Sequence, residues 1–337
     1  MLPSAKLKHH YLLEIKNLKT FFFLPEGVVK AVDDISFYMD SGECIGIVGE
    51  SGCGKSVTAL SILGLIPFPP GRIVDGEILF QGENLRKLTP AGLRSIRGNK
   101  IAMIFQEPMT SLNPVYTLGK QIAEVYTAHE GLSNKEAMAR AEEMLDKLQI
   151  PLPSKRIHEY PHNLSGGMRQ RVMIAMALAC NPELILADEP TTALDVTIQA
   201  QILERMMELQ ESLQTSVILI THNLGIVAEF ARRVIVMYAG KIVEEAPVIP
   251  LFEEPLHPYT KGLLHSIPKL GRKAIEGKQR LAEIPGMVPS LNNLPEGCHF
   301  HPRCSQARGI CRNEEPGLLP IQAGHQVACW AVMEGWE

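Results

Sequence analysis

The sequence predicts an α/β fold in which a mainly parallel sheet is covered by helices. Three short apolar runs end abruptly in polar residues or glycine, at 44–52 (CIGIVGESG), 184–190 (LILADEP) and 217–223 (VILITHN). Continuous apolar runs of this length are typical of strands buried on both faces, and helical patterns lie between them. In each run the polar residues or glycines lie at the carboxyl end. Ligands of open α/β sheets bind at that edge, so the three runs indicate one shared site.

Helices are expected at 56–66, 135–148, 168–180 and 197–213. The last segment has one apolar stripe that is expected to face the core, formed by Ile198, Ile202, Leu203, Met206 and Leu209. A hairpin that turns at Ala239 and Gly240 is predicted over 233–246. From 250 onward prolines recur every few residues and long periodic runs stop. We therefore predict a domain over 1–250 and an extension over 251–337.

Composition narrows the class of protein. The chain has 337 residues, of which 45% are hydrophobic, so about two domains with real cores are expected. The net charge of −4 disfavours nucleic acid as a partner. The apolar stretches are shorter than the ~18 residues that span a bilayer, and the first residues lack the features of a secretory signal, which favours the cytoplasm. The odd number of cysteines, seven, favours a reducing compartment.

The segment GESGCGKS (49–56) matches the G-x-x-x-x-G-K-[ST] pattern of a phosphate-binding loop and has the required strand before it and helix after it. Its glycines let the backbone turn its N–H groups toward phosphates, and the helix N-terminus adds about half a positive charge. Lys55 is expected to hold the phosphates and Ser56 to bind Mg²⁺. A glycine-rich turn without a ligand is the alternative, which the flanking strand and helix disfavour. The residues expected to contact the nucleotide here are Gly49, Glu50, Ser51, Gly52, Cys53, Gly54, Lys55, Ser56 and Val57.

Polar residues after the other apolar runs can complete such a site. Asp188 is expected to bind Mg²⁺ through water, and Glu189 to polarise the water that attacks the γ-phosphate. Two adjacent acids at a strand end are costly without such a task, although either one alone could cap a helix. His222 could contact the γ-phosphate and Gln106 could complete the Mg²⁺ shell, whereas each by itself would be an ordinary loop residue.

These motifs together resemble the nucleotide-binding subunit of ABC transporters. The set comprises the phosphate loop, Gln106, LSGGM (164–168), LILADEP, TALD (192–195) and His222, and the resemblance covers residues 13 to about 245. FQEPMTSLNP (105–114) and HPYTKGLL (257–264) resemble the dipeptide/oligopeptide branch, which includes nickel importers. The resemblance implies a P-loop NTPase fold with a RecA-like parallel-sheet core, an antiparallel β subdomain and an α-helical subdomain at about 107–180. It also implies ATP and Mg²⁺ as ligands.

In similar proteins two ATPase subunits pack head to tail, so Ser165, Gly166 and Gly167 are expected to contact ATP held by a partner. The alternative, an ordinary helix N-cap at Ser165, is compatible with that role. Met168 stands where similar proteins often have glutamine, so the polar contact of that glutamine is not expected here. Asn223 stands where aspartate is frequent. Asp195 resembles the acid that links the two sites, and Phe22 is expected to stack on adenine. A strand that buries alternate residues among Phe21, Phe22 and Phe23 is the alternative.

The resemblance further implies an ATPase that energises peptide import at the cytoplasmic face of the cell membrane. Its expected partners are two transmembrane permease subunits, a second ATPase subunit that is either another copy or a related chain, and, through the permease, a substrate-binding protein. Residues 107–125 resemble the segment that receives the permease coupling helices. The alternatives are an importer ATPase for nickel or another cargo, a soluble ABC-type mechanoenzyme that acts on nucleic acid or ribosomes, and a non-hydrolysing regulatory subunit. Intact Glu189 and His222 argue against the last.

Four of the cysteines crowd the extension: Cys298, Cys304, Cys311 and Cys329, with five, six and seventeen residues between them. Disulfides are disfavoured in the cytosol, and the short spacing of a zinc knuckle is absent. Four thiolates at this spacing can hold an iron–sulfur cluster, and the segment 297–311 resembles the extension of the oligopeptide branch that carries a [4Fe-4S] cluster. The alternatives are zinc, with His299 or His301 as a further ligand, and unligated thiols.

Overall fold

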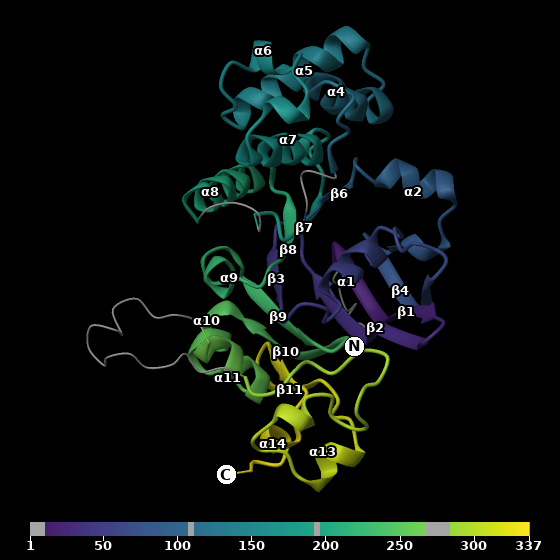
Figure 1. The fold of residues 1–337 in the computed structure, drawn as a ribbon, viewed down its shortest axis with the longest axis vertical. Helices are drawn as coiled ribbons and strands as arrows, with labels where there is room; N and C mark the ends of the chain where they lie inside the picture. Colours follow the sequence, from purple (N-terminus) through teal and green to yellow (C-terminus); the bar gives the residue numbers. More distant parts are fainter. Residues whose placement is uncertain (1–10, 107–110, 192–195, 267–283, 337) are drawn as a thin grey trace, which may run out of the picture.

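The computed structural model describes residues 11–106, 111–191, 196–266 and 284–336. Figure 1 shows an elongated molecule with a helical layer at one end, two sheets in the middle and the C-terminal extension at the other end. The predicted α/β class is confirmed. The larger sheet has eight strands in the order β11-β12-β10-β9-β3-β8-β7-β6, and the smaller has four in the order β2-β1-β4-β5.

The centre of the larger sheet is parallel and buried on both faces, as the three apolar runs predict. Neighbours among β6, β7, β8, β3 and β9 pair in parallel. In β7, Ile185 and Ala187 join the core beneath the helical layer, whereas Leu184 and Leu186 join the core shared with the smaller sheet. These strands are β3 (Cys44–Val48), β6 (Ile101–Ile104), β7 (Leu184–Asp188), β8 (Ser216–Ile220) and β9 (Arg233–Tyr238).

The smaller sheet is antiparallel and corresponds to the β subdomain that the resemblance implies. Its strands are β1 (Leu13–Leu24), β2 (Gly27–Met39), β4 (Gly71–Phe80) and β5 (Glu83–Asn84). Burial alternates at the start of β1 and resumes after a shift in register between Ile15 and Leu18, so that Leu13, Ile15 and Leu18 are buried in one core with strands β3 and β8. Helix α1 (Lys55–Ile62) contacts both β1 and β7, and therefore lies between the two sheets.

Two helices have ends that differ by two or more residues from the sequence prediction. Helix α1 stops at Ile62 instead of residue 66, because Gly64 takes a positive φ of 61° and its N–H donates to the carbonyl of Ser61. The N–H of Leu65 donates to the carbonyl of Leu60, which completes a glycine C-cap. Helix α7 (Gly166–Leu178) starts two residues earlier than 168, because the Ser165 hydroxyl accepts the N–H of Met168.

The helical layer consists mainly of α4, α5, α7 and α8, whose buried side chains share one apolar cluster. On α8, Ile202, Leu203 and Met206 are buried as the predicted stripe requires, while the side chains of Ile198 and Leu209 lie outside the described residues. No helix in the described ranges is long and apolar enough to cross a bilayer. The remaining helices and 3-10 turns before the extension are α2 (Pro90–Ile96), α4 (Leu118–His129), α5 (Asn134–Lys147), α6 (Pro153–Arg156), α8 (Val196–Leu213), α9 (Leu224–Phe230), η1 (Leu85–Lys87) and η2 (Pro161–Asn163).

The extension continues the larger sheet. The predicted hairpin is confirmed: β9 and β10 (Lys241–Pro247) pair on either side of Ala239 and Gly240, both of which have positive φ. Strand β12 (His325–Val327) then pairs with β10, and β11 (Leu319–Gln322) pairs with β12. Short helices complete the extension: α10 (Val248–Glu253), α11 (Pro258–His265), η3 (His301–Arg303), α13 (Gly309–Asn313) and α14 (Trp330–Met333). The boundary near 250 stays a prediction.

Candidate functional site

The phosphate loop begins where β3 ends and leads directly into α1. Gly49 and Gly54 have φ values of 151° and 104°, in the region that favours glycine. A Cβ at Gly49 would meet the carbonyl oxygen of Met237, and one at Gly54 would meet that of Ala31. Glycine is therefore required at both positions to bring the loop against its neighbours.

Lys55 lies inside this loop with its side chain folded back on it. Its ammonium group donates to the carbonyl oxygens of Gly49 at 2.8 Å and Glu50 at 3.0 Å. The residue is only 5% exposed. A buried cation at the N-terminus of a helix gives this loop the charge that an anionic phosphate requires.

Ser56 and Asp188 meet across the edge of the sheet. The Ser56 hydroxyl donates to a carboxylate oxygen of Asp188 at 2.9 Å. Burial raises the pKa of Asp188, and the neighbouring charge of Glu189 raises it further. The Ser56 hydrogen bond and the charge of Lys55 oppose this shift. Hydroxyl and carboxylate oxygens are the ligands that Mg²⁺ prefers, so the pair can hold Mg²⁺ directly or through water.

Glu189 is contacted from two other strand ends. Gln106 Nε2 donates to one carboxylate oxygen at 2.9 Å, and His222 Nδ1 lies 3.2 Å from the other. Glu189 takes a positive φ of 45°, and its N–H donates to the carbonyl oxygen of Ile220. Gln106 follows β6, Glu189 follows β7 and His222 follows β8. The expected convergence at one edge of the parallel sheet is confirmed, because these polar side chains come into direct contact.

Other predicted site residues lie apart from this cluster. Ser165 and Gly166 are exposed, and within the described ranges no hydrogen bond or ion pair joins them to the phosphate loop. Phe21 and Phe22 are half-buried and Phe23 is 51% exposed, so the structure does not bury alternate phenylalanines of this run. Asp195 and the rest of TALD, together with residues 107–110 of FQEPMTSLNP, lie outside the described residues.

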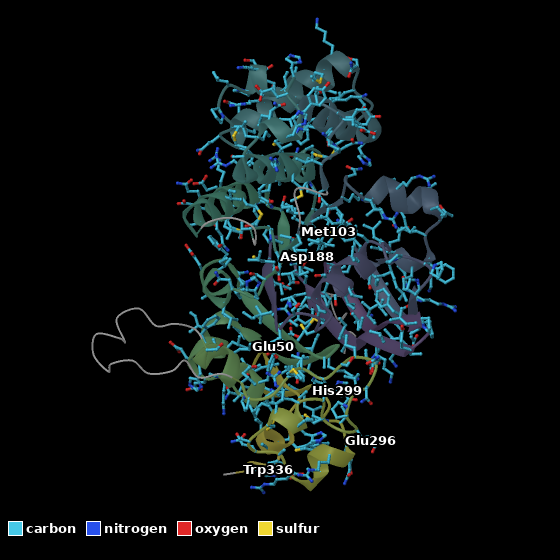
Figure 2. The ribbon with its side chains drawn as sticks, viewed as in Figure 1. Glu50, Met103, Asp188, Glu296, His299 and Trp336 are labelled. Carbon is cyan, nitrogen blue, oxygen red and sulfur yellow. The ribbon has the colours of Figure 1, made fainter. Side chains whose placement is uncertain are left out.

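The structure adds residues that sequence reasoning missed. Tyr259 and Arg303, both in the extension, contact Glu50 of the phosphate loop. Figure 2 shows Glu50 on the side of the core that faces the extension, whereas Asp188 lies closer to the helical layer. Tyr259 belongs to the HPYTKGLL segment, which indicated the family but no role for this residue. No sequence feature indicated a role for Arg303. Asn223 has a local task, because its side chain accepts the N–H of Gly225 and caps α9.

The four clustered cysteines gather around one cavity of about 20 Å³, which His257 and His301 also line. His299 instead lines a separate pocket, and its Nδ1 lies 3.2 Å from the carbonyl oxygen of Ala239. Burial raises the pKa of Cys298 to about 12, and it also raises the pKa of Cys304 and of Cys329. Among the residues that the structure describes, no group of three or more His, Cys, Asp or Glu side chains is arranged to hold a metal ion. The [4Fe-4S] cluster and zinc therefore stay predictions.

The parallel-sheet core, the phosphate loop and the carboxylates at the strand ends define an ATP-binding cassette ATPase. The chain belongs to the ABC transporter family. Residues 32–192 match the family described as ABC transporter, and residues 243–311 match the family described as the oligopeptide/dipeptide transporter C-terminal region.

Curated relatives resemble almost the whole chain. A probable peptide ABC transporter ATP-binding protein of Sinorhizobium fredii is 55% identical over 97% of this chain and 96% of its own. Two oligopeptide transport ATP-binding proteins of Bacillus subtilis are each 52% identical; the alignments cover 96% and 95% of this chain, and 97% and 88% of theirs.

Solved structures match the cassette and leave part of this chain unmatched. A dimeric ATP-binding cassette in a post-hydrolysis state with ADP and Pi has a TM-score of 0.63 at 29% identity, over 70% of this chain and 98% of that chain. A cassette from Clostridium perfringens, part of the cbiONQ transporter complex, has a TM-score of 0.62 at 25% identity, over 73% of this chain and 92% of that chain.

Proposed function

We propose that this ATPase energises the import of di- and oligopeptides through a membrane permease. The observation that carries the cargo class is the match of residues 243–311 to the oligopeptide/dipeptide C-terminal region. The names of the relatives from Sinorhizobium fredii and Bacillus subtilis agree with it. The contact cluster of Ser56, Asp188, Glu189, Gln106 and His222 supports hydrolysis as the source of energy.

Within the site, residues 49–57 bind the phosphates and Phe22 stacks on adenine. Ser56 and Gln106 bind Mg²⁺, and Asp188 binds it through water, which the hydrogen bond between Ser56 and Asp188 supports. Glu189 polarises the attacking water. His222 contacts the γ-phosphate, and its position 3.2 Å from Glu189 supports a role beside the attacking water.

Each pocket is completed by a companion subunit, either a second copy or a related ATPase. Ser165, Gly166 and Gly167 of one chain contact the γ-phosphate held by the other, and the N-terminus of α7 faces it. The exposure of Ser165 and Gly166 supports this role. ATP then holds the two subunits together, and its hydrolysis lets them separate.

The assembled transporter contains two permease subunits and works with a substrate-binding protein. The ATPase sits at the cytoplasmic face of the membrane, where residues 107–125 receive the permease. Its net charge of −4 disfavours nucleic acid as a partner.

In the extension, the four clustered cysteines hold a [4Fe-4S] cluster, with zinc as the alternative. The chemistry of the donors supports either group, because all four cysteines line one cavity, with Cys311 and Cys329 buried and Cys298 and Cys304 half-buried. A bound cation stabilises the thiolates, which burial alone disfavours. Iron, sulfide and zinc analysis of protein purified without oxygen distinguishes the outcomes. We expect iron and sulfide in equal amounts, and their loss in Cys311→Ser; protein that contains neither iron nor zinc contradicts the proposal.

Substitution of Glu189 tests the function as a whole. In vesicles that contain the assembled transporter, Glu189→Gln is expected to lower kcat for ATP by about 10²–10⁴-fold and to stop peptide uptake. ATP binding by the variant should persist, because the phosphate loop is unchanged. Glu204→Gln, an exposed residue of α8, is the matched control. Unchanged turnover in Glu189→Gln contradicts the assigned role, and uptake of nickel chelates without peptide uptake contradicts the cargo.

A further inference from the structure

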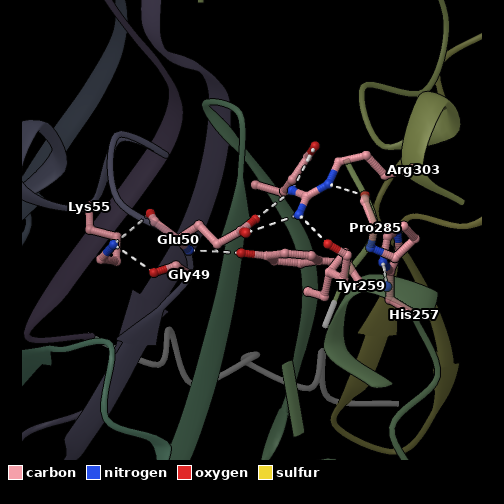
Figure 3. A network of polar contacts seen from close by, with 9 residues as sticks. Gly49, Glu50, Lys55, His257, Tyr259, Pro285 and Arg303 are labelled. Carbon is pink, nitrogen blue, oxygen red and sulfur yellow. Dashed lines mark hydrogen bonds and ion pairs between the residues drawn. The ribbon is translucent and has the colours of Figure 1, made fainter. Parts of the chain in front are cut away.

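Glu50 of the phosphate loop is held at all three of its polar groups, as Figure 3 shows. Its N–H donates to the Tyr259 hydroxyl at 2.8 Å, and its carbonyl oxygen accepts the Lys55 ammonium at 3.0 Å. Its carboxylate accepts two hydrogen bonds from the Arg303 guanidinium, at 2.7 and 3.1 Å. The extension therefore supplies two of the three contacts, more than two hundred residues along the chain from the loop.

Arg303 is fixed in place by the rest of the extension. Its Nε donates to the carbonyl oxygen of Pro285 at 3.0 Å, and Nη2 donates to that of Ile284 at 3.3 Å. Nη1 also lies 3.5 Å from the Tyr238 hydroxyl, and the side chain is only 4% exposed. A guanidinium whose donors are all engaged presents its planar fork to a carboxylate in one orientation.

Tyr259 is equally constrained. Its ring is fully buried and packs on the rings of Tyr238 and Phe300, at centroid distances of 4.7 and 5.5 Å. Its own N–H donates to His257 Nδ1 at 3.0 Å. Burial lowers the pKa of His257 to about 3, so His257 stays neutral and keeps this acceptor at physiological pH. The hydroxyl of Tyr259 thus accepts the Glu50 N–H from a fixed position.

We propose that Arg303 and Tyr259 are positioning residues for the ATPase: they hold Glu50 so that the phosphate loop is arranged for nucleotide before nucleotide arrives. Glu50 in turn helps to hold Lys55, because the carbonyl oxygens of Gly49 and Glu50 both accept hydrogen bonds from the Lys55 ammonium. A binding loop that is already ordered loses less freedom on binding, which raises affinity without any contact to the ligand. The inference rests on the ATPase activity of the chain and is independent of its cargo and of the group held by the cysteines.

The steady-state kinetics of Arg303→Met in the assembled transporter test the proposal. We expect KM for ATP to rise by about fivefold or more, with kcat changed by less than about twofold, because the loop is disordered while the reacting groups are untouched. Arg308→Met is the matched control: it is the same substitution in the same extension, but Arg308 is exposed and packs on Trp336 at 4.4 Å. A purely structural role of Arg303 would lower Tm and leave KM at the value of the control.

Two further variants keep the test decisive if Arg303→Met folds poorly. Tyr259→Phe keeps the buried ring and removes only the acceptor of the Glu50 N–H, so it should also raise KM for ATP relative to Arg308→Met. In a Glu50→Gln background, Arg303→Met should change KM by less than about twofold, because the two residues act through one contact. The proposal is overturned if Arg303→Met has its full effect in that background, or if neither Tyr259→Phe nor Arg303→Met raises KM above that of the control.

Discussion

Asp188 is a carboxylate placed where its ionisation is costly. It is 5% exposed, and burial together with the adjacent charge of Glu189 raises its pKa. The native state therefore binds this proton more tightly than the unfolded chain does. As pH rises from the unfolded pKa of Asp188 through its native pKa, the free energy of unfolding falls, and the loss persists at neutral pH. The charged carboxylate therefore lowers the stability of the native state, while it provides a ligand for Mg²⁺.

Asp188→Asn should separate these two effects. Without Mg²⁺ and nucleotide, the variant should have a higher Tm than the original chain at pH 7, because an uncharged amide replaces the buried charge. Its Mg²⁺ affinity in the presence of ATP should fall by about 10–100-fold. Thermal melts and Mg²⁺ titrations of ATP binding measure the two effects. A lower Tm together with unchanged Mg²⁺ affinity would contradict this account of the residue.

The site residues were predictable from the sequence to the extent that they end a strand or follow a glycine loop. Gln106, Glu189 and His222 follow three neighbouring parallel strands, and this topology alone brings their side chains together. Arg303 and Tyr259 were not predictable, because their positions depend on how the extension folds back on β9 and β10. No local pattern encodes a contact across more than two hundred residues.

At the scale of single elements, α7 begins with two glycines at an exposed end. Gly166→Leu should leave the helix and the fold intact, because leucine favours a helix more than glycine does. It should nevertheless abolish ATP turnover in the assembled transporter, because in the proposed pairing a side chain there would block the approach of a companion's phosphate. Circular dichroism and ATPase assays measure the two outcomes.

Gly309→Leu provides the matched control for that experiment. Gly309 also begins a helix, α13, and a Cβ there meets nothing within 4 Å. The control should keep full turnover. Full turnover in Gly166→Leu would show that this end of α7 does not meet nucleotide.

Strands β9 and β10 are joined by a buried ionic cluster. Arg233 on β9 donates to Glu43 at 3.0 Å and forms an ion pair with Glu245 of β10, and the guanidinium also packs over Tyr38. Arg233→Met should lower the free energy of unfolding by about 3–5 kcal/mol, because it leaves two buried carboxylates unpaired. The exposed neighbour Arg232 allows the same substitution as a control, which should cost less than about 0.5 kcal/mol in urea denaturation.

At the scale of the whole molecule, each chain holds only part of the proposed pocket. A strictly monomeric preparation should therefore hydrolyse ATP at less than about a tenth of the rate of the assembled transporter. The specific activity of the isolated chain should rise with protein concentration if two copies pair, and rise on addition of a related ATPase if the pair is mixed. Rates from dilution series, with oligomeric state measured on the same samples, test this. Full activity in the monomer would contradict the shared pocket.

The pairing of β12 with β10 affects how this chain can be shortened. In the native chain the outermost strand, β11, is short and carries Pro320, which cannot donate a backbone hydrogen bond to an incoming strand. A chain cut near residue 250 would lose this cover and leave β10 as an open seven-residue edge. Such an edge is a template for intermolecular strand pairing, so a cassette trimmed to the length of the solved ones would tend to aggregate unless that edge were redesigned.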